Sequence, residues 1–475
     1  MTRHDGVVPA SSEAQVDAAL ARMEAVEPLV NSVCTPNPEA LFTAVERDRE
    51  SADGRARSPL HGVPVLVKDN IDTADLPTTA GSLALADAPP PSRDAELVRR
   101  MREAGMVVLG KTNLSEWANI RDPGSTSGWS AFGGLTRNPY GLNRSAGGSS
   151  SGSGAAVAAG IARLAVGTET DGSITCPAAF NGCVGIKPTV GTVPTDGVVP
   201  ISRSQDSPGP LAASVREAAA LLTVLAGDGT DYAAHAVPGR LAGKRIGVPR
   251  STYWGYSAQA DAAAERAVAL LSVEGATVVD GTDLVDLPAA LFEDELTVLL
   301  AELRSGLGDY LAGRPGEVPR TLAEVVAFNR AHPDTELVHF GQAFFEAALA
   351  GPEDGGTEHR EARARCVDLA RDRGIDAVLR THDLDALVTP SYAPACPIDL
   401  VNAEAHPGSC SAPAAMAGYP LLTVPTELAH GLPVAVSFWG TAGSEATLVE
   451  IAHGYEAARD RTAGPLPEPA FPAFV

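Results

Sequence analysis

Short apolar runs that alternate with helical segments constrain the fold of this chain more than any other feature. Residues 62–67 and 106–109 are apolar and short, as buried strands are. Residues 92–104, which lie between them, have the pattern of a capped helix that Gly105 ends. The order strand, helix, strand predicts a parallel pair of strands in an α/β sheet.

The last third of the chain repeats this alternation. We expect strands at residues 386–388, 421–424 and 433–438, and helices at residues 412–417 and 444–459. Two further helices are expected, at residues 12–28 and 155–164. Residues 255–380 have acidic helical patterns without strand signals, so we expect a variable, mainly helical region over the core. The Pro-rich residues 465–472 predict an extended tail.

A length of 475 residues permits two to four domains or one large α/β domain. The chain shows neither an internal repeat nor a long linker that would divide it. We therefore predict an α/β protein in which residues 1–475 form a single large domain. Its mixed β-sheet is sandwiched between helical layers.

The charge balance excludes several classes of partner. The 59 acidic and 36 basic residues give a net charge of −23, which repels nucleic acid and anionic membranes. No apolar run reaches the roughly 18 residues that a transmembrane helix needs. Residues 1–5 show no apolar segment of a secretory signal, so a cytoplasmic location is expected.

Cysteines and histidines point to neither disulfides nor a metal. The six cysteines are dispersed and form no Cys-x-x-Cys pair, so we expect buried thiols. The ten histidines show no metal-ligand spacing. The sequence predicts no metal and no cofactor.

Lysine is rare in this chain, and its rarity makes each lysine a candidate for chemistry. Lysine stands only at positions 68, 111, 187 and 244, and the other 32 of the 36 basic residues are arginine. A buried lysine can lose its proton, whereas arginine stays protonated. Chance is the alternative explanation for any one of them. Lys68 ends the apolar run 62–67, where burial would lower its pKa towards neutrality.

Residues 147–154 form a Gly/Ser run that leads directly into the apolar segment from Ala155. A flexible linker is the plain alternative. A Gly/Ser loop that opens a buried helix would instead gather free N–H groups. No lysine follows in phosphate-loop spacing. Residues 148–152 also fit the Gly-x-Ser-x-Gly nucleophile elbow, but that motif follows a strand, and residues 138–146 have the pattern of a loop.

A second polar loop, residues 167–173, ends in a candidate nucleophile. Gly172 allows a sharp turn that would bring several N–H groups close to Ser173. A serine beside converging N–H donors is the arrangement that acyl transfer needs. An ordinary turn is the alternative. No histidine lies in either serine loop, so the base must come from elsewhere, and Lys68 is suited to that role.

These residues together resemble the amidase signature family, the Ser-Ser-Lys amide hydrolases. The resemblance covers nearly the whole chain and is carried by residues 61–70, 110–117, 143–185, 185–188, 204–206 and 431–433. Residues 116–119, 127–129 and 168–173 are most similar to the bacterial peptide amidase and aryl acylamidase branch.

The resemblance implies a role for each matched site residue. Ser173 is the nucleophile, Ser149 the bridging serine and Lys68 the base, with a cis peptide bond entering Ser149. The oxyanion hole consists of the N–H groups of Thr170, Asp171, Gly172 and Ser173. Many family members have Gly at position 171 and Arg at position 175, where this chain has Asp171 and Thr175. The substrate-binding residues stay unknown.

The function that the resemblance implies is hydrolysis of a peptide C-terminal amide or an aryl or alkyl amide through a Ser173 acyl-enzyme. The implied partner is a small-molecule or peptide substrate; we expect no nucleic acid and no membrane, and a monomer or homodimer. One alternative is an amidotransferase A-type subunit that releases ammonia from glutamine. The other is a non-catalytic binding protein on the same scaffold.

Overall fold

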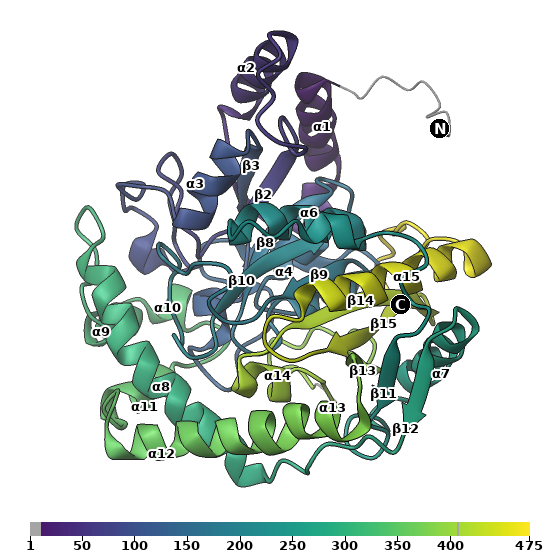
Figure 1. Cartoon of the computed structure of the whole chain (residues 1–475). Helices are drawn as coiled ribbons and strands as arrows, with labels where there is room; N and C mark the ends of the chain where they lie inside the picture. The colour runs from purple at the N-terminus through teal and green to yellow at the C-terminus, as the bar shows by residue number, and fades with distance from the viewer. Residues whose placement is uncertain (1–10, 406–407) are drawn as a thin grey trace.

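The computed structural model describes residues 11–405 and 408–475. The predicted absence of a signal at residues 1–5 lies outside the described part. The core is an eleven-stranded sheet in the order β1-β3-β2-β8-β10-β9-β14-β15-β13-β11-β12 (Figure 1). Its strands are β1 Val33–Pro36, β2 Pro64–Lys68, β3 Val107–Thr112, β8 Leu164–Glu169, β9 Val184–Lys187, β10 Ser207–Ala212, β11 Arg245–Val248, β12 Thr277–Asp280, β13 Ala386–Pro390, β14 Leu421–Ala429 and β15 Leu432–Trp439.

The sheet is mixed, as predicted. Strand β2 is parallel to β3 and to β8, whereas β10 and the β14–β15 hairpin pair antiparallel to their neighbours. Because β2 and β8 are parallel neighbours, their carboxyl ends lie side by side. This pairing brings Lys68, the last residue of β2, next to the end of β8.

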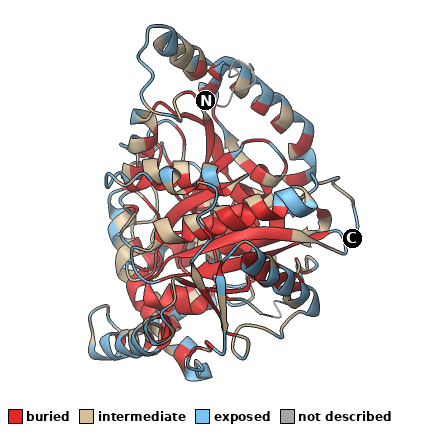
Figure 2. Ribbon diagram, turned by 45° about the vertical axis from the view of Figure 1, so that its right-hand side comes forward, coloured by how far each residue is buried: buried red, intermediate tan, exposed pale blue. Residues whose placement is uncertain are grey.

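Helices cover both faces of the sheet, and the exposed residues of these helices lie on their outer surfaces (Figure 2). The helices are α1 Ser12–Val30, α2 Ala40–Ala52, α3 Glu96–Glu103, α4 Ser151–Ala158, α5 Thr175–Asn181, α6 Val215–Ala226, α7 Ala258–Val273, α8 Ala289–Ala312, α9 Leu322–Ala331, α10 Pro333–Glu336, α11 Ala343–Ala350, α12 Thr357–Cys366, α13 Asp376–His382, α14 Ala412–Ala417 and α15 Glu445–Ala463. No described helix is long and apolar enough to cross a membrane.

The side chains of β2 alternate between the two faces of the sheet, and this alternation determines the face on which Lys68 lies. Val65 and Val67 belong to the core cluster that includes residues of α3, α6 and α15. Leu66 points to the other cluster, with residues of α1 and α4. Successive side chains of a strand alternate between faces, so Lys68 lies on the side of α4, the helix that the Gly/Ser run opens.

Several predicted boundaries were wrong. The first helix is capped by Ser11, whose side chain accepts from Ala14 N, and it continues past Pro28 to Val30. Helix α3 starts at Glu96 rather than residue 92. Helix α4 starts inside the Gly/Ser run, and Leu164, expected to end that helix, instead begins β8.

Residues 138–146 are not a plain loop. Two short strands, β6 Arg137–Asn138 and β7 Gly141–Ser145, form a hairpin there, and a second small pair joins β4 Trp129–Ser130 to β5 Gly134–Leu135. The region 255–380 is also less uniform than predicted, because β12 extends the sheet at one edge. The strand β12 has polar residues at both ends and none that is fully buried, so its sequence lacks the apolar run that predicts a buried strand. Helices α8 to α12 do form a separate layer, at the lower left of Figure 1.

Candidate active site

The end of β2 places Lys68 in a fully buried position among hydroxyl groups. Its Nζ donates to Ser149 Oγ at 2.8 Å, to Thr168 Oγ1 at 2.9 Å and to the Thr168 carbonyl at 3.3 Å. Burial lowers the pKa of Lys68 to about 7, although the charges of Asp206 and Glu169 oppose this shift. A lysine with such a pKa can be neutral near pH 7 and can accept a proton.

The loop before α4 presents Ser149 to this lysine. The Gly148–Ser149 peptide bond is cis, as the resemblance implies. Ser115 N donates to the Ser149 carbonyl at 3.1 Å, and Ser150 N donates to the Ser173 carbonyl at 3.0 Å. The second of these bonds holds the two serine loops against each other.

Ser173 lies on the turn between β8 and α5. Gly172 has a φ of +81°, and a Cβ there would lie 2.6 Å from the Tyr392 hydroxyl, so only glycine fits. Glu169 Oε2 accepts from Ile174 N at 2.7 Å and from Thr175 N at 2.8 Å. In the described part of the chain, the N–H groups of Asp171, Gly172 and Ser173 have no hydrogen-bond acceptor. They are therefore available to a substrate oxyanion.

Two residues that depart from the family pattern lie beside this turn. The Oδ1 atom of Asp171 is buried without a hydrogen-bond partner among the described residues, and burial raises the pKa of Asp171 to about 6. The Thr175 hydroxyl donates to Glu169 Oε2 at 3.0 Å. Thr175 thus supports the turn through Glu169.

The structure separates the four lysines by their partners. Lys111 and Lys187 are as buried as Lys68. The Nζ atom of Lys187 donates to the carbonyls of Tyr419 and Pro188. Lys244 is partly exposed and forms an ion pair with Glu450 at 2.8 Å. Of the four, only Lys68 bonds a serine of the two Gly/Ser loops.

Sequence reasoning assigned no role to three supporting residues. Thr168 holds the Lys68 amine, Glu169 holds the start of α5, and Asp206 accepts from the Thr170 hydroxyl at 2.6 Å. All three belong to runs that carry the family resemblance, so their positions were visible while their contacts were not.

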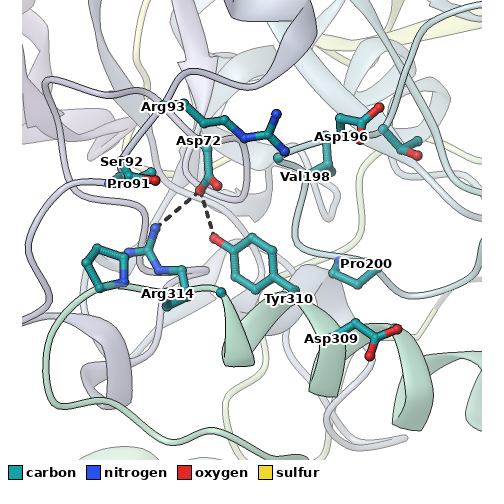
Figure 3. A pocket seen from close by; sticks show the side chains of 15 residues that line it. Asp72, Pro91, Ser92, Arg93, Asp196, Val198, Pro200, Asp309, Tyr310 and Arg314 are labelled. Carbon is teal, nitrogen blue, oxygen red and sulfur yellow. Dashed lines mark hydrogen bonds and ion pairs between the residues drawn. The ribbon is translucent and has the colours of Figure 1, made fainter.

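Two adjoining cavities lie to one side of this site. The first has a volume of about 560 Å³. In it Tyr310 and Arg314 both contact Asp72, and Arg93 lies on the opposite side (Figure 3). The second cavity, of about 370 Å³, has Asp206 in its wall. Neither is lined by Ser173.

One trio has the residue types of a metal site. Glu302, Asp354 and His359 each offer an atom within 4.8 Å of the others. The Glu302 oxygens, however, already accept from Ser202 Oγ and from His359 Nε2, and the Arg203 guanidinium lies 3.5 Å away. These partners satisfy the carboxylate without a cation.

The mixed sheet and the buried Lys68–Ser149 hydrogen bond fit an α/β amide hydrolase, and the comparisons with known proteins show this class. The family model described as Amidase matches residues 14–449. The chain therefore belongs to the amidase family and is an amide hydrolase.

Relatives and a solved structure refine this assignment. A probable amidase of Arabidopsis thaliana is 36% identical, over 94% of this chain and 87% of that protein. A glutamyl-tRNA(Gln) amidotransferase subunit of Symbiobacterium thermophilum is 34% identical, over 93% of this chain and 92% of that protein. The native peptide amidase of Stenotrophomonas maltophilia is 46% identical, with a TM-score of 0.88 over 97% of this chain and 96% of that one. The resemblance to the peptide amidase branch is thus confirmed.

Proposed function

We propose that this amidase hydrolyses the C-terminal amide of peptides, or a similar neutral amide, through a Ser173 acyl-enzyme. The observation that carries the proposal is the 2.8 Å hydrogen bond from Lys68 Nζ to Ser149 Oγ, made by a lysine with a pKa of about 7. The similarity to a solved peptide amidase supports the substrate class.

The first half of the reaction forms the acyl-enzyme. Neutral Lys68 takes a proton from Ser149 while Ser149 takes the proton of Ser173, whose Oγ attacks the amide carbon. The free N–H groups of residues 171–173 stabilise the resulting oxyanion, with Thr170 N as the fourth donor that the family resemblance implies. When the C–N bond breaks, Ser149 returns the proton to the departing nitrogen, and ammonia leaves.

The second half consumes water. A water molecule gives its proton to Lys68 through Ser149 and attacks the acyl carbon. Collapse of the second tetrahedral intermediate releases the carboxylic acid and returns the proton to Ser173. The cycle needs no cofactor.

Asp171 supports a neutral substrate. Above about pH 6 its carboxylate is ionised, and it lies two residues before the nucleophile. Repulsion by this carboxylate would weaken binding of a substrate carboxylate a few ångströms away by at least about 1 kcal/mol, which lowers kcat/KM by at least roughly fivefold. A pair of peptide amides that differ only in a neutral or an acidic penultimate side chain tests this, and equal kcat/KM values would contradict it.

The main test is ammonia release from a peptide amide by the purified chain and by Ser173→Ala. We expect the variant to lose at least roughly 10³-fold in kcat, because residues of a triad act as a unit. Ser153→Ala is the matched control: this buried serine of α4 bonds Thr112 and Val166 instead of Lys68. Activity of Ser173→Ala near that of the control would refute the nucleophile.

The same assay decides between the rivals. An amidotransferase A-type subunit would release ammonia from glutamine and not from a peptide amide, and a binding protein would release none. A cytoplasmic location, and a monomer or homodimer, stay predictions.

A further inference from the structure

The loop of residues 201–206 joins the oxyanion turn to the helical layer. Asp206 lies at its end and is 8% exposed. Its Oδ1 accepts from Thr170 Oγ1 at 2.6 Å, and its Oδ2 accepts from Ile201 N at 2.8 Å and Ser202 N at 3.0 Å. The carboxylate thus binds its own loop and the oxyanion turn at once.

Helix α8 holds this loop from the opposite side. Glu302 accepts from the hydroxyls of Ser202 and Ser204, each at 2.6 Å, and from Ser204 N at 3.0 Å. Gln205 Nε2 donates to Glu295 Oε1, also on α8, at 2.8 Å. With its loop held at several points, Asp206 is a firm support for Thr170.

We propose that Asp206 is a positioning residue that acts through Thr170: its hydrogen bond holds residues 170–173 so that their N–H groups face the oxyanion. This inference rests on the proposed function, because it assigns the oxyanion hole to that turn. Thr170 begins the turn, and the three N–H groups that follow have no partner among the described residues to fix them. Among the described residues, the remaining hydrogen bond of Thr170 without its hydroxyl would be the long 3.5 Å contact between its carbonyl and Gln205 Nε2.

The charge of Asp206 has a second, separable effect. Lys68 is faced by the carboxylates of Asp206 and Glu169, and both favour the protonated amine. Asp206 itself is faced by Glu302 of α8, and the cavity that it lines also contains Arg203, Asp309 and Asp354. Burial raises the pKa of Asp206 to about 6, so its charge is present in the pH range where Lys68 titrates.

Three variants separate the hydrogen bond from the charge. Thr170→Val removes the hydroxyl and keeps the charge of Asp206, and Thr170→Ser is its control. Asp206→Asn keeps the geometry, because one amide oxygen can accept from Ile201 N and Ser202 N while the NH₂ group donates to the Thr170 oxygen. It removes only the charge.

The readouts are kcat, KM and the pH profile for ammonia release from a peptide amide. We expect Thr170→Val to lower kcat at least roughly tenfold with little change in KM. The oxyanion forms only in the transition state, so weaker stabilisation of it lowers kcat and leaves substrate binding nearly unchanged. Thr170→Ser should stay within about threefold of wild type. In Asp206→Asn the acidic limb should move to lower pH by roughly half a pH unit or more, since Lys68 loses a neighbouring negative charge. Thr170→Val should leave that limb in place.

Full kcat in Thr170→Val would overturn the positioning role of Asp206. A pH profile of Asp206→Asn identical to that of wild type would overturn the separate effect of its charge on Lys68. Ser173→Ala, measured beside these variants, separates this failure from a failure of the proposed function. If Ser173→Ala is inactive while Thr170→Val is fully active, only the positioning role is lost. If Ser173→Ala is active, the proposed nucleophile itself is wrong.

Discussion

Two neighbouring parallel strands each carry a buried lysine near the carboxyl end, and the two lysines meet different chemistry. In β2 the Lys68 amine bonds the hydroxyls of Ser149 and Thr168. In β3 the Lys111 amine bonds the carbonyls of Ile71 and Pro77 at 2.7 and 3.2 Å and the Thr78 hydroxyl at 2.9 Å, and it forms an ion pair with Asp69 Oδ1 at 3.5 Å. Burial lowers the pKa of both lysines.

The partners decide what each lysine can do. A hydroxyl both donates and accepts, so it can bond a neutral amine as well as an ammonium ion and can pass on a proton. Carbonyl and carboxylate oxygens only accept, so they favour the protonated amine. Lys68, bonded to the Ser149 hydroxyl, is thus placed to exchange protons, whereas Lys111, beside the Asp69 carboxylate, is placed to hold the loop that follows β2.

The largest expected effect comes from Lys68→Arg. Arginine keeps the charge but stays protonated, so we expect it to lower kcat by at least roughly 10³-fold, nearly as much as Lys68→Ala. Ammonia release from a peptide amide measures this. If Lys68 only formed structural contacts like those of Lys111, arginine would substitute tolerably, and near-wild-type activity would remove the distinction between the two lysines.

Lys111→Met should affect folding rather than chemistry. Its removal leaves Asp69 buried without its ion-pair partner, which costs about 3–5 kcal/mol in the free energy of unfolding. Denaturant unfolding measures this cost, and kcat of the folded fraction should stay within about tenfold of wild type. The double variant Lys111→Met/Asp69→Asn should recover part of the stability. Loss of kcat without loss of stability would show that Lys111 takes part in the reaction.

The pH profile sharpens the comparison further. Because the pKa of Lys68 is about 7, its neutral form is lost as pH falls below 7. We expect kcat/KM to fall about tenfold for each pH unit below that value and to level off above it. Rates of peptide amide hydrolysis between pH 5 and 9 test this. A profile that falls with rising pH would require protonated Lys68 and would contradict its role as base.

The smallest expected effect is that of metal removal. If a lysine supplies the base, dialysis against a chelator should leave kcat unchanged. The control is the same enzyme dialysed without chelator. Activity that is lost and then restored by Zn²⁺ would assign the chemistry to a metal and leave both lysines with structural roles.

Much of the fold was predictable where burial and periodicity agree. Strands β2 and β3 and helix α14 lie where the apolar runs placed them. The prediction of buried thiols also holds: all six cysteines are free, and five are buried. Strand β12 was missed because an edge strand alternates less clearly. The start of α4 was missed because glycine and serine are poor helix formers, and here tertiary contacts override their propensity.

For the site, sequence reasoning named Lys68, Ser149 and Ser173. In the structure Lys68 contacts Ser149, and a backbone hydrogen bond joins the Ser149 loop to the Ser173 loop. It assigned no contacts to Thr168, Glu169 or Asp206. Their partners are 5 to 100 residues away along the chain, and no local pattern encodes such pairs.

The sequence by itself determined the α/β class, the amidase family and the residue types from which a base and a nucleophile could be drawn. The sequence also singled out Lys68 as the candidate base, but only the tertiary structure shows what contacts its amine. Burial lowers the pKa of Lys68 and of Lys111 alike, so the difference between them lies in the Ser149 hydroxyl beside Lys68 and the Asp69 carboxylate beside Lys111. The surroundings of Lys68 are made by the parallel pairing of β2 with β8 and by a serine 81 residues further along the chain.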